Sequence, residues 1–421
     1  MTSPRSYLFS LEQIGIKLGL DQIRALVEHL GAPHTAYPSM LVAGTNGKGS
    51  VTAMLERGLR AAGYRTGRYT SPHLTQIEER VAIDGLPIAA DVFDAAADRV
   101  RDASQALSQP PSFFEATTAL ALDVFRREAV DIAVLEVGMG GRLDATNIAP
   151  AMAAAITLVD FDHEHYLGRT LEAIAGEKAG IVKPGTLVVL AENPAAVEVV
   201  VADACTVAGA TLVRASVGVT SSVEMEEGRA IVNMTTPRAR YRELRLGLRG
   251  AHQVANALTA VRLLEETAGA GLIRAPGHAI RSAVEDVVWP ARLELLDDCG
   301  TAVLIDGAHN AAGARALAAH VQDTYHRRLP IVLGVMRDKA IGAIVGALAP
   351  AASHFFCVAA SSERAATPAE LLAIAHAEAP EVPASAEPSP LAGLRRAETT
   401  GAPVVVAGSL YLAGEIRSIL A

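Results

Sequence analysis

Cysteines are scarce in this sequence and long apolar runs are missing, and each absence excludes a class of protein. The three cysteines, Cys205, Cys299 and Cys357, are far apart and form no C-x-x-C pair. This spacing argues against a disulfide framework or a zinc ribbon and fits a reducing compartment. No apolar run reaches the roughly 20 residues that span a bilayer, and the first residues lack the apolar block of a signal peptide. We therefore expect a cytoplasmic protein with no membrane partner.

Basic residues are fewer than acidic residues in this chain. Lys and Arg number 37 against 46 Asp and Glu, so the formal net charge is -9 and there is no basic footprint for nucleic-acid binding. Hydrophobic residues make up 50% of the chain and charged residues 20%, as in an average soluble globular protein, whereas disorder would need fewer apolar residues. At roughly 100–200 residues per domain, a chain of 421 residues is expected to form two or three domains.

Short apolar runs alternate with helical patterns along the first two thirds of the chain. Each run is bounded by Gly, Asp or Pro, as strands of a parallel sheet usually are. The predicted strands are Met40–Ala43, Ile132–Val137, Ala153–Val159 and Leu187–Leu190. The predicted helices between and after them include Ser50–Ala62, Phe114–Arg127 and Ala195–Ala208. This alternation predicts a doubly wound sheet, followed by a side elaboration with antiparallel strands at Ala230–Met234 and Tyr241–Leu248 and by a long helix over His252–Thr267.

A second alternation begins after Trp289-Pro290, which we interpret as a hinge because proline stiffens the link and keeps the preceding residue out of a helix. We expect residues 1–288 to form a large domain with a mainly parallel sheet. Residues 289–421 are expected to form a smaller Rossmann-like domain, which makes the protein α/β throughout. Its predicted strands are Leu293–Leu296, Thr301–Asp306, Ile331–Val335, His354–Ala359 and Val404–Ala407. The Ala- and Pro-rich stretch Ala379–Pro390 is predicted to be a solvent loop.

The most informative segment lies between a predicted strand and a predicted helix. Its residues are Gly44, Thr45, Asn46, Gly47, Lys48, Gly49 and Ser50. Backbone N–H groups in such a loop can hold phosphate oxygens at the helix N-terminus. Lys48 can reach terminal phosphates, and the Ser50 hydroxyl can meet them or a metal. The segment is a variant of the phosphate loop because Gly49 separates Lys48 from Ser50, and the alternative is a glycine turn that only precedes a helix.

Two acidic segments follow predicted strands, where open α/β sheets place ligands and metals. Glu136 is a candidate metal carboxylate, and the alternative is a tight turn in which Glu136 pairs with Arg142. In the segment from Asp160 to His165, two histidines are two residues apart rather than at the i, i+4 spacing of helical zinc proteases, which disfavours zinc. Magnesium prefers oxygen ligands, so the residues alone leave the role of His163 open.

Further segments have an ordinary structural explanation beside a functional one. Lys178 lies near a predicted helix end, where lysine is usually a solvated partner of the helix dipole. Asp306 and His309 end a strand of the second domain and could bind a small molecule at a site shared between two domains, or they could merely accompany an Asn310 helix cap.

The segment Ser112–Glu115 fits the capping box S-x-x-E at a helix start, so Glu115 could serve only the backbone N–H of Ser112. Phe114, between them, belongs either to the core or to a stacking surface for a flat ligand ring.

Together these segments resemble the bacterial folylpolyglutamate synthase and dihydrofolate synthase family, within the Mur-type ATP-dependent peptide ligases. The resemblance runs through almost the whole chain. It rests on G-T-N-G-K-G-S at Gly44, T-S-P-H-L at Thr70, E-R-V at Glu79, F-F-E-A-T-T at Phe113, E-V-G-M-G-G-R-L-D-A-T-N at Glu136, D-H at Asp162, E-K-A-G-I at Glu177, R-L-E at Arg292, D-G-A-H-N at Asp306 and G-S-L-Y-L at Gly408. The T-S-P-H-L and G-G-R-L-D-A-T-N segments separate it from the cell-wall Mur ligases.

The resemblance implies particular residues for each ligand. Around ATP it places Gly44 to Ser50, Asn256, Arg292 and Asp306. Around magnesium it places Ser71, Glu136, His163 and Lys178. For the pterin or folate it implies Phe114, Glu115, Leu143, Asp144 and Ala145, with the stretch Ser10–Gln13 nearby. For glutamate it implies His309 and Ser409, and it gives catalytic roles to Lys48, Lys178 and His309.

The resemblance also implies the chemistry. ATP would phosphorylate a carboxylate of dihydropteroate or a reduced folate, and the amine of L-glutamate would attack the acyl phosphate. The implied cofactors are one or two Mg²⁺ ions, a carbamylated Lys178 and, as a further candidate, a monovalent cation. Closure of the second domain would exclude water. We expect a monomer with small-molecule substrates and no nucleic-acid partner.

One departure from the family pattern is visible, and two alternatives compete. The hinge segment reads Pro290-Ala291-Arg292, whereas the family usually has glycine between the proline and the arginine. The nearest alternative is another Mur-type ligase acting on a cell-wall nucleotide or a peptide polymer. A more distant one is a phosphate-loop nucleotide switch, which would not need the D-G-A-H-N segment. The family itself includes glutamate addition to dihydropteroate and to reduced folates, and the pocket residues do not separate the two.

Overall fold

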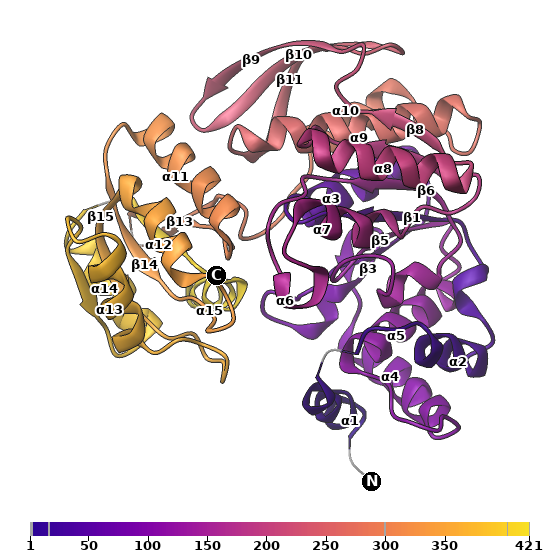
Figure 1. Cartoon of the computed structure of the whole chain (residues 1–421), viewed down its shortest axis with the longest axis horizontal. Coiled ribbons are helices and arrows are strands. Elements are labelled where there is room, and N and C mark those ends of the chain that lie inside the picture. Colours follow the sequence, from indigo (N-terminus) through magenta and orange to yellow (C-terminus); the bar gives the residue numbers. More distant parts are fainter. Residues whose placement is uncertain (1–2, 16, 299, 402, 421) are drawn as a thin grey trace. The chain divides into compact units, whose positions relative to one another are not determined.

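The computed structural model describes residues 3–15, 17–298, 300–401 and 403–420 (Figure 1). Cys299 lies outside the described residues. The contacts divide the chain into two compact units. The first comprises Met1–Ser222, Asn233–Leu244 and Ala255–Val287, and the second comprises Val223–Val232, Arg245–Val254 and Val288–Ala421. The sequence predicted one boundary, between residues 288 and 289. The contacts also assign two earlier segments, Val223–Val232 and Arg245–Val254, to the second unit.

The first unit is built on an eight-stranded sheet with the order β4-β3-β2-β5-β1-β6-β7-β8. The strands are β1 (Ser39–Ala43), β2 (Thr66–Tyr69), β3 (Val81–Ile83), β4 (Leu86–Pro87), β5 (Ile132–Glu136), β6 (Ala151–Ile156), β7 (Leu187–Leu190) and β8 (Thr211–Arg214). In this spatial order, every pair of neighbouring strands from β2 through β5, β1, β6 and β7 to β8 is parallel. At the β2 edge, β3 and β4 are added in antiparallel orientation. The carboxyl ends of β2, β5, β1 and β6 therefore lie side by side, and the loops that follow them can share a site.

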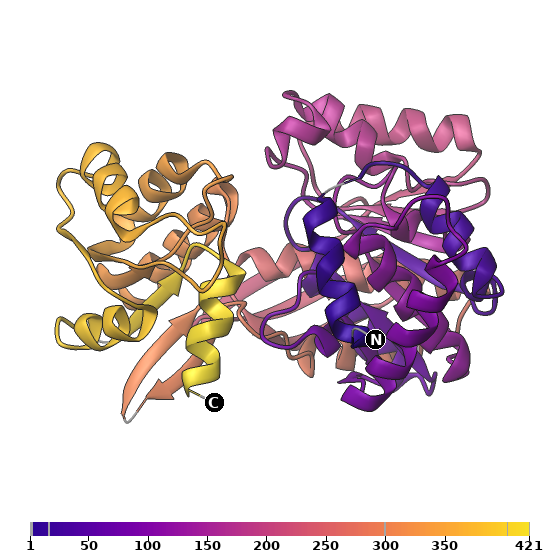
Figure 2. The same cartoon turned by 90° about the horizontal axis from the view of Figure 1, so that it is seen from below.

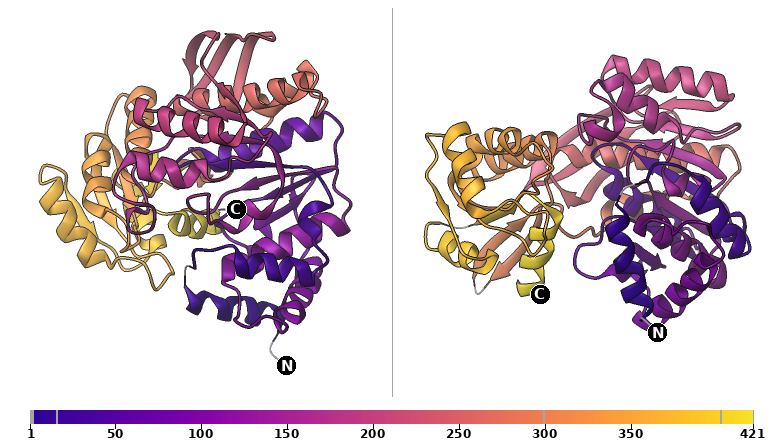
Figure 3. Two further views of the ribbon diagram at one scale, coloured as in Figure 1. Left: turned by 45° about the vertical axis from the view of Figure 1, so that its right-hand side comes forward. Right: turned by 60° about the horizontal axis from the view of Figure 1, so that its bottom comes forward.

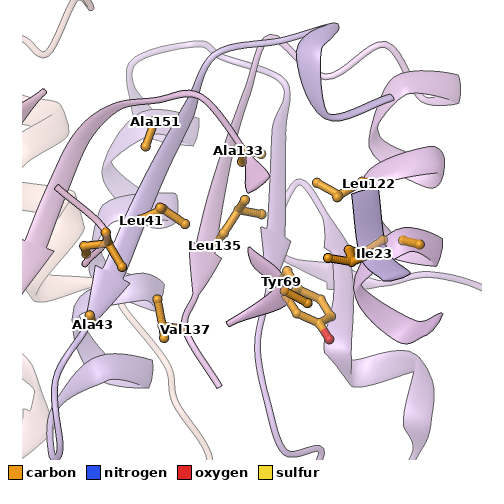
Figure 4. Close-up of a cluster of buried hydrophobic side chains, with 14 of the residues drawn as sticks. Ile23, Leu41, Ala43, Tyr69, Leu122, Ala133, Leu135, Val137 and Ala151 are labelled. Carbon is orange, nitrogen blue, oxygen red and sulfur yellow. The ribbon is translucent and has the colours of Figure 1, made fainter. Parts of the chain in front are cut away.

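Helices cover both faces of this sheet. They are α1 (Pro4–Ser10), α2 (Asp21–His29), α3 (Lys48–Ala61), α4 (Ala90–Ser104), α5 (Phe113–Arg127), α6 (Glu164–Leu167), α7 (Leu171–Ala179), α8 (Ala195–Ala208), α9 (His252–Gly269) and α10 (Gly277–Glu285), with short 3-10 helices at Leu11–Ile14, Pro33–Thr35, Ile77–Arg80 and Ala145–Ile148. One face packs buried side chains such as Leu41, Leu135 and Tyr69 against Ile23 of α2 and Leu122 of α5 (Figure 4).

The other face carries α3, which packs closely against α9 and α10 at Gly58. A Cβ atom at Gly58 would lie 2.8 Å from Cδ1 of Leu264 and 2.9 Å from Cβ of Ala283, so only glycine permits this approach. The close packing of α3 against α9 and α10 thus depends on this glycine.

The second unit contains a six-stranded sheet with the order β12-β13-β17-β14-β15-β16. Its strands are β12 (Glu294–Asp298), β13 (Thr301–Ile305), β14 (Leu329–Leu333), β15 (Ala352–Cys357), β16 (Ala384–Ala386) and β17 (Val404–Ala407). Only β12 is antiparallel to its neighbour. The helices are α11 (Ala311–Tyr325), α12 (Ile341–Leu348), α13 (Pro368–Glu378), α14 (Pro390–Glu398) and α15 (Leu410–Leu420), with a 3-10 helix at Ala349–Ala351. Buried residues of α11, α12 and α13 form a common core with the sheet. Figure 3 shows the ribbon of this unit, in orange and yellow, from two further directions, and α15 leads to the C-terminus marked in Figure 2. The expected α/β architecture is confirmed.

The chain between β8 and α9 forms a three-stranded sheet with the order β11-β10-β9. Its strands are β9 (Thr220–Glu226), β10 (Arg229–Thr235) and β11 (Arg240–Arg249). The strands predicted at Ala230–Met234 and Tyr241–Leu248 are both present, whereas β9 was not predicted because its residues are exposed throughout and show no apolar face.

The stretch Ala379–Pro390 is not the solvent loop expected from its composition. It contains β16, which pairs in parallel with β15 at the sheet edge. The N–H of Phe355 donates to the Pro383 carbonyl at 2.9 Å, and the N–H of Glu387 donates to the Cys357 carbonyl at 2.9 Å. These bonds use backbone atoms only, so a strand of small residues forms here without an apolar pattern. Within the described residues, no helix is long and apolar enough to cross a membrane.

His320 of α11 is a buried, neutral histidine and gives the second unit a predictable acid sensitivity. Its side chain lies against the β9–β10 turn, where a Cβ atom at Gly228 would be 2.6 Å from its Cε1 atom. Burial, with a smaller contribution from Arg249, lowers the pKa of His320 to about 4, and Asp323 opposes this shift. Between this pKa and the ordinary value the unfolded chain binds more protons, so the stability of this unit falls as the pH drops through that window.

Replacement of His320 by glutamine is therefore expected to flatten the pH dependence of unfolding below pH 6.5. The slope of the free energy of unfolding against pH should decrease by at most about 1.4 kcal/mol per pH unit, the contribution of one proton. Urea unfolding of both proteins at a series of pH values measures this slope. An unchanged slope would contradict the assignment of a neutral buried imidazole.

Candidate active site

The glycine-rich loop Gly44–Ser50 connects β1 to α3 as expected. Gly44 has a φ of +149° and Gly47, which caps the helix, has a φ of +89°, both in the region that favours glycine. The first amides of an α-helix such as α3 have no acceptor within the helix, and groups of this kind can bind an anion. The N–H groups of Thr45 and Asn46 are directed elsewhere, because both donate to the Leu158 carbonyl, at 2.8 and 3.2 Å.

Lys48 begins α3 and turns its side chain back over the loop. Its Nζ atom donates to the carbonyls of Gly44 at 3.2 Å and Thr45 at 3.1 Å. The ammonium group is thereby held at the loop, where the charge can neutralise an anion bound by the first amides of the helix.

Lys178, in the last turn of α7, is 3% exposed. Its Nζ atom donates to the same Gly44 carbonyl at 2.8 Å, so both lysines converge on one loop atom. Burial, with a smaller contribution from the Lys48 charge, lowers the pKa of Lys178 to about 7, against the opposing effects of Asp162 and Asp144. The prediction from helix position alone that Lys178 is solvated is therefore wrong, because tertiary packing covers this end of α7.

Glu136 ends β5, Ser71 follows β2, and His163 lies in the segment after β6; the carboxyl ends of these strands share one edge of the sheet, with β1 between β5 and β6. Glu136 is the last residue of β5, is buried, and pairs in register with Val42 of β1. The N–H of Ser71, after β2, donates to Oε2 of Glu136 at 3.2 Å. His163 caps α6 with a φ of +52°.

Arg142 does not pair with Glu136, as one alternative proposed. Its guanidinium contacts Glu177 at 2.6 Å, and its N–H donates to the Glu177 carbonyl at 2.7 Å. The alternative of a Glu136–Arg142 pair is therefore wrong, because Glu177 is the partner of Arg142. In the described part of the chain, no three His, Cys, Asp or Glu side chains are grouped closely enough to hold a metal by themselves.

The loop after β5 brings Phe114 and Asp144 together. A Cβ atom at Gly138 would lie 2.5 Å from Cζ of Phe114 and 3.2 Å from Oδ2 of Asp144, so both side chains lie against the same bare glycine. Asp144 is buried and accepts the N–H groups of Met139 at 2.9 Å and Thr146 at 3.0 Å. Burial raises the pKa of Asp144, although these hydrogen bonds oppose the shift. The predicted neighbours Leu143 and Ala145 flank Asp144 in the chain.

Glu115 closes the capping box of α5, which confirms the structural explanation for that segment. Oε2 of Glu115 accepts the N–H and the hydroxyl of Ser112, both at 2.8 Å, and the N–H of Glu115 donates back to the Ser112 hydroxyl at 3.3 Å. One carboxylate oxygen is therefore committed to the helix start.

Asn256 of α9 lies against the glycine-rich loop. A Cβ atom at Gly47 would be 2.3 Å from its Oδ1 atom. Asn256 and Gly47 are therefore close in space although they are far apart in the chain, and the nucleotide role that the resemblance implies for Asn256 stays a prediction.

The second unit places Arg292 and Asp306 side by side. Asp306, directly after β13, is buried and accepts the N–H groups of Leu293 at 2.9 Å and Ala308 at 2.8 Å. Burial raises the pKa of Asp306, and the Arg292 charge opposes this. A Cβ atom at Gly307 would be 2.6 Å from Nη1 of Arg292.

The residue before Arg292 is Ala291, which has a φ of +54°. Alanine in this left-handed conformation costs about 1–2 kcal/mol, which gives a conformational reason for the glycine that the family usually has here.

His309, Asn310 and Ser409 have defined local roles in the second unit. Nδ1 of His309 lies 2.8 Å from the Gly307 carbonyl. A carbonyl can only accept, so Nδ1 carries the proton. Asn310 caps α11 by accepting the Gly313 N–H at 2.9 Å, and the buried Ser409 hydroxyl accepts the Leu412 N–H at 3.1 Å at the start of α15.

Sequence reasoning missed Thr157, which follows β6 and contacts the glycine-rich loop. Its hydroxyl lies 2.7 Å from the Asn46 carbonyl. The sequence gives no signal for this role: the predicted strand Ala153–Val159 includes Thr157, whereas β6 ends at Ile156, and the contact joins segments more than a hundred residues apart.

Family models match both regions of the chain. The Mur ligase middle domain matches residues 42–264, and the glutamate ligase domain of Mur ligases matches residues 291–410. A relative named dihydrofolate synthase/folylpolyglutamate synthase, from Mycobacterium tuberculosis, is 38% identical over 351 residues, which cover 79% of this chain and 72% of that protein.

Solved structures of high similarity are available. The M. tuberculosis folylpolyglutamate synthase complexed with ADP and AMPPCP has a TM-score of 0.90 and 32% identity, with 99% of each chain covered. E. coli FolC in complex with DHPP and ADP has a TM-score of 0.89 and 29% identity, with 99% of this chain and 97% of that chain covered. A bifunctional folylpolyglutamate synthase/dihydrofolate synthase with Mn, AMPPNP and L-glutamate bound has a TM-score of 0.86 and 28% identity, with 100% and 98% covered.

The fold, the loop and these matches define an ATP-dependent ligase of the Mur type. Within that class, the chain belongs to the folylpolyglutamate synthase/dihydrofolate synthase family.

Proposed function

We propose that this ligase joins L-glutamate to a carboxylate of dihydropteroate or a reduced folate, with conversion of ATP to ADP and phosphate. The observation that carries the proposal is the convergence of Lys48 and Lys178 on the Gly44 carbonyl, in a loop that leads into a helix N-terminus. Support comes from relatives whose solved structures contain ADP with DHPP, or AMPPNP with L-glutamate.

The chemical problem is that a carboxylate is a poor acyl donor, since its leaving group would be oxide. Transfer of the γ-phosphoryl group of ATP to a carboxylate oxygen gives an acyl phosphate and ADP. The neutral amine of glutamate then attacks the acyl carbon, loses a proton, and releases phosphate from the tetrahedral intermediate. Phosphoryl transfer needs positioning and charge neutralisation above all, and we assign these tasks to Lys48 and the first amides of α3.

A divalent cation fits the donors at the strand ends. Mg²⁺ usually keeps several waters and binds one or two protein carboxylates together with substrate phosphates. Glu136 supplies a buried carboxylate beside Ser71, and we propose that these two residues, with His163, hold the ion. When bound, Mg²⁺ would neutralise charge on the phosphates. The manganese complex of the relative supports divalent-metal use.

Lys178 has the environment that carbamylation requires, and we propose that it carries a carbamate in the active enzyme. Carbamylation joins the nitrogen of a neutral amine to the carbon of CO₂ and releases a proton, which turns a cation into an anion. With its pKa lowered to about 7, a large fraction of the buried Lys178 is neutral near neutral pH. The resulting carboxylate would supply oxygen ligands for a second metal ion.

For the remaining substrates, the proposal follows the family pattern. We assign the pterin ring to Phe114 and Asp144, which face the same glycine. Leu143, Ala145 and Glu115 flank these two, although one oxygen of Glu115 already serves the helix cap. In the second unit, we assign Arg292 and Asp306 to the nucleotide and His309 and Ser409 to glutamate.

Incorporation of labelled glutamate tests the proposal and its alternatives together. The protein is incubated with ATP, Mg²⁺ and labelled glutamate, and separately with dihydropteroate, a reduced folate or a UDP-muramyl precursor. We expect ATP-dependent product with dihydropteroate, with the reduced folate, or with both. Product from the UDP-muramyl precursor alone would favour a cell-wall ligase, and ATP consumption without any amide product would favour a nucleotide switch.

A further inference from the structure

The glycine-rich loop is supported on its outer side by Thr157, a residue that no ligand role explains. Thr157 follows β6 and is 1% exposed. A Cβ atom at Gly44 would lie 1.8 Å from its hydroxyl oxygen and 3.0 Å from its Cβ atom. The threonine side chain therefore fills the space that any side chain at position 44 would need, so only glycine fits beside Thr157.

The hydroxyl of Thr157 also contacts backbone acceptors on both sides of Gly44. Its Oγ1 atom lies 2.7 Å from the Asn46 carbonyl and 3.2 Å from the Ala43 carbonyl, and its N–H donates to the Ala43 carbonyl at 2.8 Å. A hydroxyl has one proton to donate, so the shorter contact identifies Asn46 as its main acceptor, while the backbone N–H serves Ala43.

Peptide geometry transmits this contact to the side of the loop that faces a ligand. In a planar trans peptide, the C=O and the following N–H point in opposite directions. A hydrogen bond that holds the Asn46 carbonyl toward Thr157 therefore directs the Gly47 N–H away from Thr157. Gly47 is the cap of α3, where N–H groups are available for an anion.

The segment that carries Thr157 is itself fixed. Nδ2 of Asn193 donates to the Thr157 carbonyl at 3.2 Å, and Oδ1 of Asn193 accepts the Val159 N–H at 2.8 Å. The hydroxyl of Thr45 donates to the Asp160 carbonyl at 2.9 Å and accepts the Asp160 N–H at 3.0 Å. The loop is thus joined to a rigid segment that continues toward His163.

We propose that Thr157 is a positioning residue that holds the Gly47 amide in its nucleotide-binding orientation. The inference rests on the proposed nucleotide role of the loop. On this inference, Thr157 affects ATP binding through the loop backbone and does not contact ATP directly. Its replacement should therefore change the affinity for nucleotide, which replacement of a merely structural threonine would not do.

Thr186 provides a matched control. It is also 1% exposed, and its hydroxyl donates to the Ala151 carbonyl at 3.2 Å. It precedes β7, at the amino end of the strand, away from the strand ends that carry the site. Thr157→Ala and Thr186→Ala therefore remove the same type of hydrogen bond from the same sheet, and comparable stability losses are expected.

Calorimetric titration of the full chain with ADP and Mg²⁺ tests the proposal. Thr157→Ala should weaken ADP binding about ten-fold, the equivalent of one hydrogen bond. Thr157→Ser, which keeps the hydroxyl, should stay within about three-fold of wild type, and Thr186→Ala should show wild-type affinity. In steady-state ligation, Thr157→Ala should raise KM for ATP and leave KM for glutamate unchanged.

The inference would be overturned by an unchanged ADP affinity in Thr157→Ala, or by an equal loss in Thr157→Ala and Thr186→Ala that follows their thermal stabilities. Failure of Thr157→Ser to restore affinity would also contradict it. Wild-type protein that binds no ADP would instead refute the proposed function, so the two failures are distinguishable.

Discussion

Replacement of Lys48 by alanine is expected to reduce ATP-dependent ligation by on the order of a thousand-fold, the size of effect seen when a fixed positive group is removed from a phosphoryl-transfer or oxyanion site. The Lys48 ammonium lies 3.2 Å from the Gly44 carbonyl and 3.1 Å from the Thr45 carbonyl, within the loop that we assign to the phosphates. Its loss leaves the charge of the transferring phosphoryl group without its lysine partner, while the amides of α3 remain.

The measurement compares ligation rate, ATP turnover and ADP affinity with thermal unfolding. Alanine favours helix, so Lys48→Ala should fold normally. Arg57→Ala is the matched control, because it removes a cation from the same helix, paired with Asp286 at 2.8 Å, and should keep wild-type ligation. Full ligation by Lys48→Ala would contradict the assignment of this loop to the phosphates.

Replacement of Lys178 by alanine is expected to abolish most of the activity, by about 100-fold or more. In the amine form the side chain donates to the Gly44 carbonyl at 2.8 Å, and in the proposed carbamate form it supplies an anion in a buried position. Added short carboxylates such as acetate or propionate should restore part of the activity, because they can enter the space left by the side chain and replace its oxygen atoms.

Lys183→Met separates this effect from the general loss of a buried lysine. Burial also lowers the pKa of Lys183, to about 8, and its Nζ atom donates to the carbonyls of Asn147 at 2.6 Å and Ala149 at 2.5 Å. This variant should lose stability without becoming dependent on added carboxylates. Wild-type activity of Lys178→Ala in their absence would remove the proposed role of the carbamate.

The ends of β1, β5 and β7 could be predicted from the sequence to within one residue, because apolar runs followed by polar turns identify them, whereas β6 ends three residues before its predicted end. Glu136 and the start of α3 were found in this way, and both are where parallel topology requires them. The capping box of α5 was also predictable, since it depends on residues three apart.

Residues whose roles depend on contacts between distant segments could not be predicted from local patterns. Lys178 was interpreted as solvated because nothing in its helix indicates that packing buries it. Thr157 has no motif, and its meaning appears only when Gly44 is placed against it. The strand β16 is held by backbone hydrogen bonds and has no apolar signature. The roles assigned to His163, Arg292 and Ser409 come from family resemblance, and no local spacing implies them.

The net charge of -9 has a consequence for how substrates bind. ATP, glutamate and the pteroate or folate are all anions, so long-range attraction by the whole chain does not account for their binding. The attraction must come from local groups, and the proposed ones are Lys48, the first amides of α3, Arg292 and a bound metal ion.

The transfer of oxygen from the substrate carboxylate to phosphate tests the central claim most directly. Dihydropteroate or a reduced folate labelled with oxygen-18 in the reacting carboxylate is incubated with the enzyme, ATP, Mg²⁺ and glutamate, and the phosphate is analysed by mass spectrometry. An acyl phosphate intermediate predicts one labelled oxygen in each phosphate released and one in the new amide. Unlabelled phosphate, released with or without a glutamate adduct, would contradict the account.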